Sequence, residues 1–200
     1  MPPFQQSTWD LGLPSGEPRS LRQSTWSPGL SNGARSLSDV YAGMPRDAEP
    51  GVAWYVRLLE NPRSPLALAG AVTLFDHDCI HIVLGRGLLP QDEAFVLGFT
   101  MGTSEACPAW QPSFFRFCAR RLYQAPYRFS AEDSQVFDFA VRVARRTKAA
   151  ALDRVNFRAW MSRPLREIRA ELRVDGHALQ SIYAAERARW PDGPASRRLP

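Results

Sequence analysis

Cysteine and long apolar runs are scarce in this sequence. The three cysteines, Cys79, Cys107 and Cys118, are an odd number and lack the paired short spacing of a zinc ribbon. No apolar run reaches the roughly 18 residues that a membrane-spanning helix needs, and the weakly polar stretch 65–75 ends at Asp76. The N-terminus lacks the basic and then apolar segments of a secretory signal. These absences exclude a disulfide framework and predict a cytoplasmic protein, either soluble or peripheral to a membrane.

Lysine is nearly absent, because arginine supplies 24 of the 25 basic residues, and this bias indicates a GC-rich bacterial source. Residues 1–115 carry 7 basic and 11 acidic groups, whereas residues 116–200 carry 18 and 9. Clustered arginine favours an anionic partner such as a membrane surface, although a solvated helix face has the same composition. No zinc finger, helix-turn-helix or RNA-binding motif accompanies it, so we expect no nucleic acid partner.

Histidine, cysteine and isoleucine are missing from the first fifty residues, which hold 7 of the 17 prolines, 8 serines and 5 glycines. Such a segment buries too little apolar area to offset the entropy lost on ordering. We therefore predict a disordered tail over 1–50 and one helical metal-binding domain over 51–200. The length of 200 residues and the apolar content of 44% agree with one domain and a tail.

The predicted tail contains a repeat with the pattern QSTWxxGLxxG. It begins at Gln6 and again at Gln23, and the triplet Arg-Ser-Leu follows each copy. A tryptophan and a leucine in a flexible setting are typical of a docking motif, and two tethered copies gain avidity. We predict that the repeats dock on a protein partner or assembly; the alternative is a duplicated linker without a binding role.

Strand-like alternation is scarce after residue 51, so the predicted fold class is all-α. Helices are expected over 53–60, 66–84, 113–123, 131–151, 164–174 and 176–190, with a further helix that begins at Pro90. Gly85 is expected to end the second of these helices, and proline suits the first turn of the next. Ser130 and Asp133 have the spacing of a capping box at the start of another.

A short segment of the second predicted helix has metal-ligand spacing. His77 and His81 lie four residues apart, and Asp78 lies three before His81, so the three side chains are expected on one helix face. A five-residue connection over 85–89 predicts an antiparallel helix hairpin that brings Glu93 beside them. Imidazole and carboxylate ligands favour a divalent metal, with zinc first and iron, manganese or magnesium as alternatives.

One residue beside the predicted ligands is a candidate partner of the site, and two other residues are excluded from it. Asp76 is interpreted as a second-shell partner that holds His77, or as a solvated neighbour. Cys79 lies between ligands on the helix and is expected to point away from the metal. His177 is expected on the surface of the last helix.

His77-Asp78-x-x-His81, followed by eleven residues and Glu93, resembles the signature of the coenzyme Q (ubiquinone) biosynthesis protein 4 family. A weaker similarity to the Leu-Arg-Glu-Glu-Leu segment of that family occurs at 164–174, so the resemblance spans about residues 50–175. It implies an all-α protein that holds a divalent metal through the four signature residues. It also implies replacement of the C1 carboxyl group of a prenylated hydroxybenzoate ring by a hydroxyl group, beside other quinone-pathway enzymes at a membrane surface.

Aromatic and basic residues on the predicted helix 113–123 are candidates for lipid binding. With the apolar stretch before Asp76, three phenylalanines are interpreted as lining an isoprenoid cavity, and the alternative is a plain core. The arginines are interpreted as contacts for lipid headgroups, and the alternative is a solvated face. The candidate residues are Phe114, Phe115, Phe117, Arg116 and Arg120. The expected partners are a prenylated quinone precursor or isoprenoid lipid, quinone-pathway enzymes and, as an option, a second copy of the chain in a homodimer.

Two alternatives to a metal-dependent decarboxylase follow from the same residues. Four protein ligands can close a tetrahedral site, and the chain would then be a non-catalytic, prenyl-lipid-binding scaffold with a structural metal. A His-Asp phosphohydrolase needs an earlier histidine on another helix, and no histidine precedes His77. The phosphohydrolase interpretation is therefore set aside.

Overall fold

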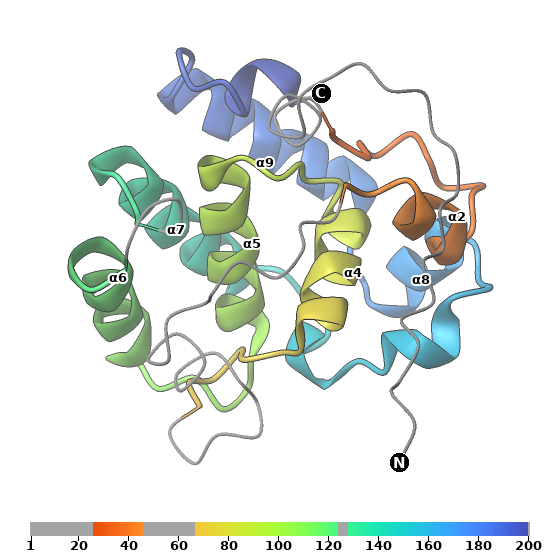
Figure 1. The fold of residues 1–200 in the computed structure, drawn as a ribbon, viewed down its shortest axis with the longest axis horizontal. Helices are drawn as coiled ribbons and strands as arrows, with labels where there is room; N and C mark the ends of the chain where they lie inside the picture. The colour runs from red at the N-terminus through yellow and green to blue at the C-terminus, as the bar shows by residue number, and fades with distance from the viewer. Residues whose placement is uncertain (1–25, 46–66, 124–127, 200) are drawn as a thin grey trace, which may run out of the picture.

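The computed structural model describes residues 26–45, 67–123 and 128–199, and these residues form helices without a strand (Figure 1). The predicted all-α fold is confirmed for this part of the chain. The α-helices are α2 (Leu37–Ala42), α4 (Leu74–Leu84), α5 (Pro90–Thr103), α6 (Gln111–Arg121), α7 (Ala131–Ala144), α8 (Leu165–Glu171) and α9 (Gly176–Arg189). Short 3-10 helices lie at Leu152–Arg154, Phe157–Trp160 and Ser196–Arg198.

Helices α4 and α5 form the predicted hairpin. Helix α4 is ended by Gly85, whose φ of 71° is left-handed. This backbone conformation suits glycine because glycine has no Cβ atom. Helix α5 begins five residues later with Pro90 in its first turn, where the missing N–H costs no helical hydrogen bond. Figure 1 shows the two helices side by side and running in opposite directions.

Two predicted helices are longer than the helices in the structure. The helix expected over 66–84 begins only at Leu74, because Gly70 has a φ of 86° and Thr73 caps the new N-terminus. The helix expected over 131–151 ends at Ala144. The helix expected over 53–60 lies outside the described residues.

The centre of the core is the packing of α5 against α7. Gly98 and Gly102 lie one turn apart on α5, and a Cβ atom on either would come within 2.8 Å of a backbone oxygen of α7. The two glycines therefore allow the helix backbones to approach closely. Phe95, Phe99 and Phe137 are fully buried around this contact, and burial of side chains of this size drives folding.

Residues 26–45 belong to the folded domain, which corrects part of the predicted tail. Leu37 and Val40 of α2 are buried in the core. The Leu37 N–H donates to the carbonyl oxygen of Arg163 at 3.0 Å, and the Leu165 N–H donates to that of Arg35 at 2.9 Å. The composition that favours disorder therefore does not prevent this stretch from packing. Residues 1–25, with the first repeat copy, and residues 46–50 lie outside the described residues.

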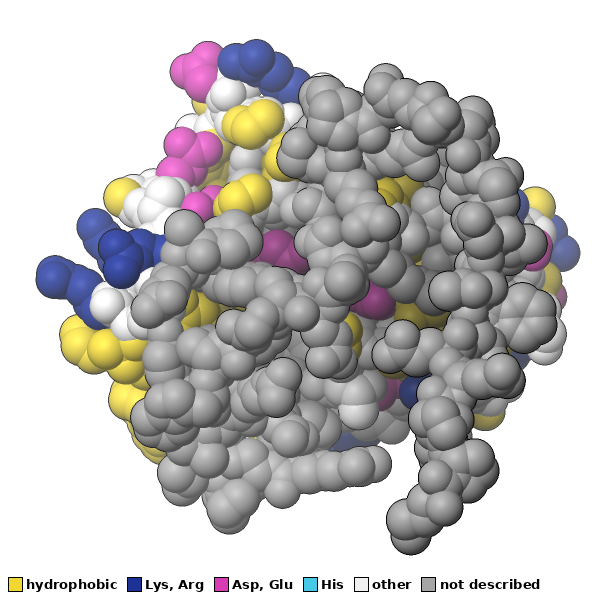
Figure 2. Space-filling view, in the orientation of Figure 1, with side chains coloured by type: hydrophobic (Ala, Val, Ile, Leu, Met, Phe, Trp, Pro, Cys, Tyr) yellow, Lys and Arg dark blue, Asp and Glu magenta, His cyan; other side chains and the backbone are white. Residues whose placement is uncertain are grey.

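Helix α6 presents large apolar side chains at the molecular surface. The exposed fractions are 59% for Trp110, 58% for Phe117 and 51% for Leu122. At the left edge of Figure 2, where Figure 1 places α6, hydrophobic side chains lie next to arginine or lysine side chains. None of the helices in the described ranges has both the length and the apolar character needed to cross a bilayer.

Candidate metal centre

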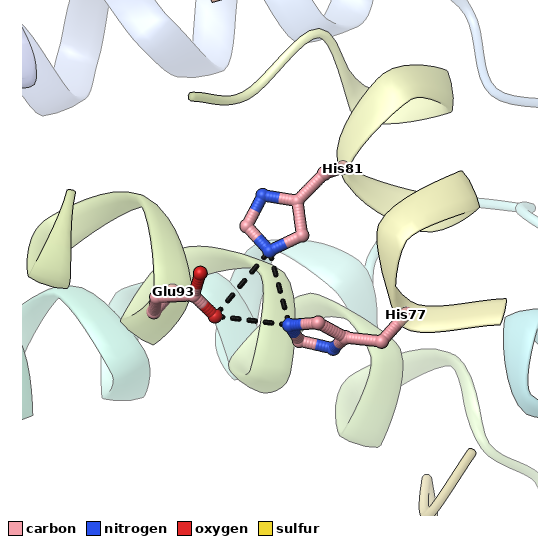
Figure 3. Close-up of side chains that lie close together, drawn as sticks. All are labelled: His77, His81 and Glu93. Atoms are coloured by element: carbon pink, nitrogen blue, oxygen red, sulfur yellow. Dashed lines mark hydrogen bonds and ion pairs between the residues drawn. The ribbon is translucent and has the colours of Figure 1, made fainter. Parts of the chain in front are cut away.

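Three of the predicted ligands converge between α4 and α5 (Figure 3). The His77 Nε2 atom lies 2.9 Å from Glu93 Oε2 and 3.0 Å from His81 Nε2. The His81 Nε2 atom lies 3.3 Å from the same Glu93 oxygen. The side chain of His81 is fully buried, whereas those of His77 and Glu93 are 17% and 33% exposed. The three donor atoms therefore meet in a group that is open to solvent on one side.

The ring of His81 is held by the connection between the helices. Its Nδ1–H donates to the carbonyl oxygen of Gly87 at 2.7 Å. Because a carbonyl oxygen only accepts hydrogen bonds, this contact places a proton on Nδ1, and Nε2 is the ring nitrogen that faces the other two ligands. A backbone carbonyl in this position is the usual outer partner of a metal-binding histidine.

Glu93 is positioned by the start of α5. The neighbouring Asp92 carboxylate accepts the N–H of Leu89 at 3.1 Å and so caps the helix, while Glu93 one position later faces α4. Burial raises the pKa of the Glu93 carboxyl, but in the metal-free chain the charge that His81 carries when protonated and hydrogen bonds from His77 and His81 outweigh it and lower the pKa well below its usual range. Glu93 is therefore a carboxylate at neutral pH.

The spacing of the three donor atoms fits a metal ion. Atoms that bind one zinc ion at about 2.0–2.1 Å lie roughly 3.0–3.4 Å from one another. The distances between the Nε2 and Oε2 atoms, 2.9 to 3.3 Å, are in or close to this range. Two imidazole nitrogens and a carboxylate oxygen also bring lone pairs together, and a cation relieves their repulsion. The group can therefore hold a metal ion.

Asp78, the fourth residue of the signature, is not part of this group. One residue along an α-helix is a rotation of about 100°, so Asp78 leaves the helix in a different direction from His77. Asp76 does not form the expected contact with His77 either; its hydrogen bonds are with Thr73. Its carboxylate accepts the hydroxyl of Thr73 at 2.5 Å and its N–H donates to the same oxygen, which makes it part of the α4 cap.

Two predicted exclusions from the site are confirmed. Cys79 is fully buried in the core, and burial together with the nearby Asp76 and Asp78 raises the pKa of its thiol to about 12. A thiol in this state is a poor metal ligand. His177 is exposed near the start of α9.

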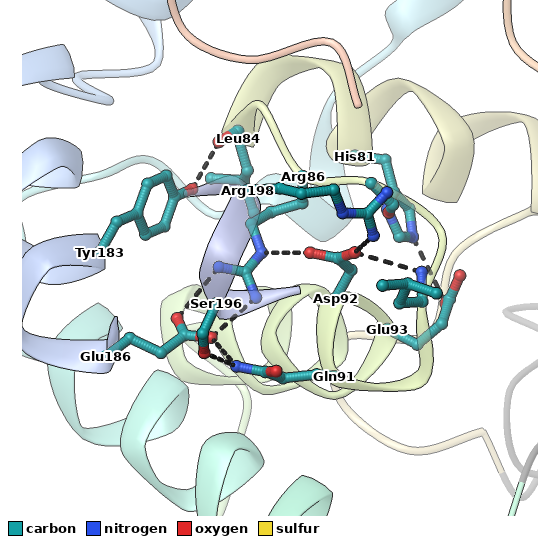
Figure 4. A network of polar contacts seen from close by, with 12 residues as sticks. His81, Leu84, Arg86, Gln91, Asp92, Glu93, Tyr183, Glu186, Ser196 and Arg198 are labelled. Carbon is teal, nitrogen blue, oxygen red and sulfur yellow. Dashed lines mark hydrogen bonds and ion pairs between the residues drawn. The ribbon is translucent and has the colours of Figure 1, made fainter. Parts of the chain in front are cut away.

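A buried ionic network on the same connection was not predicted from the sequence (Figure 4). Arg86 is fully buried and forms two hydrogen bonds to Glu186, at 2.9 and 3.0 Å, and an ion pair with Asp92 at 3.1 Å. Burial alone lowers the pKa of Arg86, but the two carboxylates reverse the shift and raise it. The Tyr183 hydroxyl donates to the carbonyl oxygen of Leu84 at 2.5 Å. Further members are Gln91, Ser196 and Arg198. The network fixes the connection that carries Gly87.

The lipid-binding candidates on α6 separate into two groups. Phe115 is 2% exposed and stacks on Phe137, so it packs in the core, which favours the alternative interpretation as a core residue. Arg116 pairs with Asp138 of α7, a contact that ties the two helices together. Phe114, Phe117 and Arg120 are exposed. Only these three remain available for a lipid surface.

Comparisons with known proteins do not assign a family. No protein-family model matches the chain. Searches of curated proteins and of solved structures gave no significant match. The candidate centre is therefore defined by its own geometry, and the resemblance of its signature to the coenzyme Q biosynthesis protein 4 family stays a prediction.

Proposed function

We propose that this chain is a metal-dependent protein that acts on prenylated hydroxybenzoate-type quinone precursors. The observation that supports this proposal is the convergence of His77, His81 and Glu93 from two helices. These residues are three of the four positions of the signature, and they are brought together by a five-residue connection. A signature retained only as sequence would not require its residues to meet in space.

The number of ligands favours a catalytic centre over the scaffold with a structural metal. Structural zinc sites are usually closed by four protein ligands, whereas catalytic sites have three and leave a position open. Among the described residues, the group contains three ligands, and the Glu93 side chain is 33% exposed. Two histidines and one carboxylate are also the ligand set of non-haem iron oxygenases. We therefore infer an open site for zinc or iron.

The proposed reaction is the oxidative replacement of a ring carboxyl group. The ring carbon loses the carboxyl group as carbon dioxide and gains a hydroxyl group, so an oxidant is consumed, and we expect dioxygen. One oxygen atom then enters the hydroxyl group and the other leaves as water, with two electrons and two protons supplied by an external reductant. When bound, the metal supplies a Lewis acid that polarises the carboxylate and phenolate oxygens, and iron adds oxygen chemistry. His81, locked by Gly87, and the ionised Glu93 hold the metal beside the substrate.

A lipid substrate requires access to a membrane, and α6 is the surface we propose for it. Trp110, directly before α6, is 59% exposed, and Phe114 and Phe117 on α6 are 41% and 58% exposed, with Arg120 exposed nearby. Aromatic side chains favour the interfacial region of a bilayer, and arginine attracts anionic headgroups. We propose that the chain binds peripherally through this helix.

Metal content tests the ligand set. Elemental analysis of the untagged full chain should find about one equivalent of metal in the wild type. His81→Ala and Glu93→Ala should retain little, while Asp78→Asn should retain it because Asp78 lies outside the group. His177→Ala, which removes an exposed histidine, is the matched control. Metal retained by folded His81→Ala would refute the site, and metal lost in Asp78→Asn as well as in His81→Ala and Glu93→Ala would show that Asp78 is a fourth ligand.

Turnover tests the reaction itself. The metal-loaded chain is mixed with phospholipid vesicles that contain a carboxyl-labelled prenylated hydroxybenzoate, in air with a chemical reductant. We expect release of labelled carbon dioxide and a hydroxylated ring by mass spectrometry, and neither with His81→Ala. Substrate binding without carbon dioxide release by the metal-loaded chain would favour the scaffold. Phe117→Glu should weaken vesicle binding and leave metal content unchanged.

A further inference from the structure

The second copy of the QSTWxxGLxxG repeat is seated on the folded domain through its backbone. The carbonyl oxygens of Gly29 and Leu30 accept hydrogen bonds from the Arg169 guanidinium at 3.4 and 3.2 Å. The carbonyl oxygen of Trp26 accepts one from Arg198 at 3.5 Å, and that of Gly33 accepts the N–H of Arg166 at 2.9 Å. Three arginine positions thus form a receptor for main-chain oxygens, which we call the repeat seat.

The repeat seat is connected to the metal hairpin. Arg169 is 7% exposed, and it also donates to the carbonyl oxygens of Val83 and Ile82 in the last turn of α4, at 2.8 and 3.2 Å. A Cβ atom on Gly85 would lie 2.6 Å from the Gly29 oxygen, and one on Gly87 would lie 2.7 Å from the Trp26 oxygen. The repeat therefore lies directly against the connection that orients His81.

Among the described residues of the second copy, four that the first copy shares are packed against the domain or have a left-handed backbone conformation. Trp26 and Leu30 are partly buried against the core, Leu37 is fully buried and Gly29 has a left-handed φ of 63°. Each of the four has its identical counterpart in the first copy, namely Trp9, Leu13, Leu21 and Gly12.

The positions that differ between the copies include those that face solvent. Ser27, Ser31 and Ala34 are exposed. The first copy has Asp10 and Pro14 in place of the two serines, and two residues in place of the alanine. The half-buried Pro28 and Asn32 also differ, but the Asn32 amide donates to the Pro28 carbonyl oxygen at 3.1 Å, a hydrogen bond within the segment itself.

We propose that residues 6–21 are a second ligand for the repeat seat of the same chain and exchange with the second copy. The chemistry that the seat recognises is a row of main-chain carbonyl oxygens followed by a leucine, and both copies offer it. Tethering in one chain gives the first copy a high effective concentration at the seat. The protein partner predicted for the repeats is then, at the repeat seat, the folded domain of the same chain.

A mutant cycle in the full chain tests this exchange by thermal unfolding. Leu30→Ala should lower Tm by only about 1 °C, because the first copy takes its place, and Leu13→Ala should not change it. Leu13→Ala/Leu30→Ala, with neither intact copy, should lower Tm by roughly 4 °C or more. Ser27→Ala/Ser31→Ala, at exposed positions, is the matched control and should match the wild type. A Leu30→Ala loss equal to that of the double variant would overturn the proposal.

A synthetic peptide of residues 6–21 gives a second measurement that does not depend on the size of the Tm loss. The peptide should raise the Tm of the Leu13→Ala/Leu30→Ala chain in a dose-dependent manner, and a peptide with Trp9→Ala and Leu13→Ala should not. No effect of the intact peptide would overturn the proposal. If Leu30→Ala becomes a dimer by light scattering and its Tm rises with protein concentration, the occupant is a second chain and the same-chain proposal is wrong.

Discussion

Two clusters of polar side chains are attached to the connection between α4 and α5, and they differ in charge balance. In the buried network, Arg86 and Arg198 face Asp92 and Glu186, so the positive and negative charges match. In the candidate metal centre, His77, His81 and Glu93 bring three acceptors together without an arginine or lysine among them.

The difference separates a structural cluster from a ligand site. A buried network that satisfies its own charges has no need of a cation, whereas an acceptor-only group that is partly exposed has room for one. Substitutions that remove one element of this contrast are therefore expected to change either stability or metal binding.

Glu186→Ala should have the largest effect on stability. It leaves Arg86 buried without its bidentate partner, and loss of one member of a buried pair costs about 3–5 kcal/mol of the free energy of unfolding. Denaturant unfolding of the metal-free chain measures it. Glu171→Ala breaks the ion pair of Arg163 with a 51% exposed carboxylate and should cost less than about 1 kcal/mol. If the two variants lose the same free energy of unfolding, the buried network does not have the structural role assigned to it.

His81→Ala should have the largest effect on metal affinity and a smaller one on the metal-free fold. It removes one of three ligands, and we expect the affinity to fall by more than the roughly 100-fold that outer-sphere changes produce. Competition with a chromophoric chelator measures the affinity, and circular dichroism measures the helical content. A variant that unfolds without metal in the medium would instead show that His81 acts through packing.

The caps and the metal hairpin follow from local sequence, which is why they could be predicted. The spacing of His77 and His81, Gly85 as a helix end and Pro90 as a helix start each depend on a few neighbouring residues. Glu93 then follows from the length of the connection. Asp78 does not belong to the group that converges in the structure, so the fourth ligand of the signature stays a prediction.

Long-range contacts could not be predicted in this way. Arg86 and Glu186 are separated by 100 positions, and nothing local to either residue indicates the other. The second repeat copy contains few apolar residues, so its composition favours disorder, yet it binds the domain through carbonyl oxygens that every residue possesses. The composition of a segment indicates how much apolar area it can bury. It does not indicate whether arginines elsewhere in the chain will bind the segment's carbonyl oxygens.

Gly87→Ala tests whether the two clusters are coupled through the connection. A Cβ atom there would lie 2.7 Å from the Trp26 oxygen and 2.9 Å from the Asp92 carboxylate, so the backbone must shift. Because the Gly87 carbonyl holds His81, we expect a 10- to 100-fold loss of metal affinity, about that of other outer-sphere changes. Gly176→Ala, with no atom near its added methyl, should leave the affinity unchanged. An unchanged affinity in Gly87→Ala would uncouple the centre from the connection.

Asp76→Ala should have the smallest effect and sharpens the boundary of the metal centre. Asp76 is adjacent to His77 in sequence, but its carboxylate and N–H both bond to Thr73, so we expect a loss of about 1 kcal/mol in unfolding free energy and no loss of metal. Asp133→Ala removes the equivalent acidic residue from the α7 cap, distant in sequence from the metal ligands, and should cost a similar amount. If Asp76→Ala weakens metal binding and Asp133→Ala does not, the Asp76 carboxylate acts on His77. Asp76 would then belong to the metal centre as well as to the α4 cap.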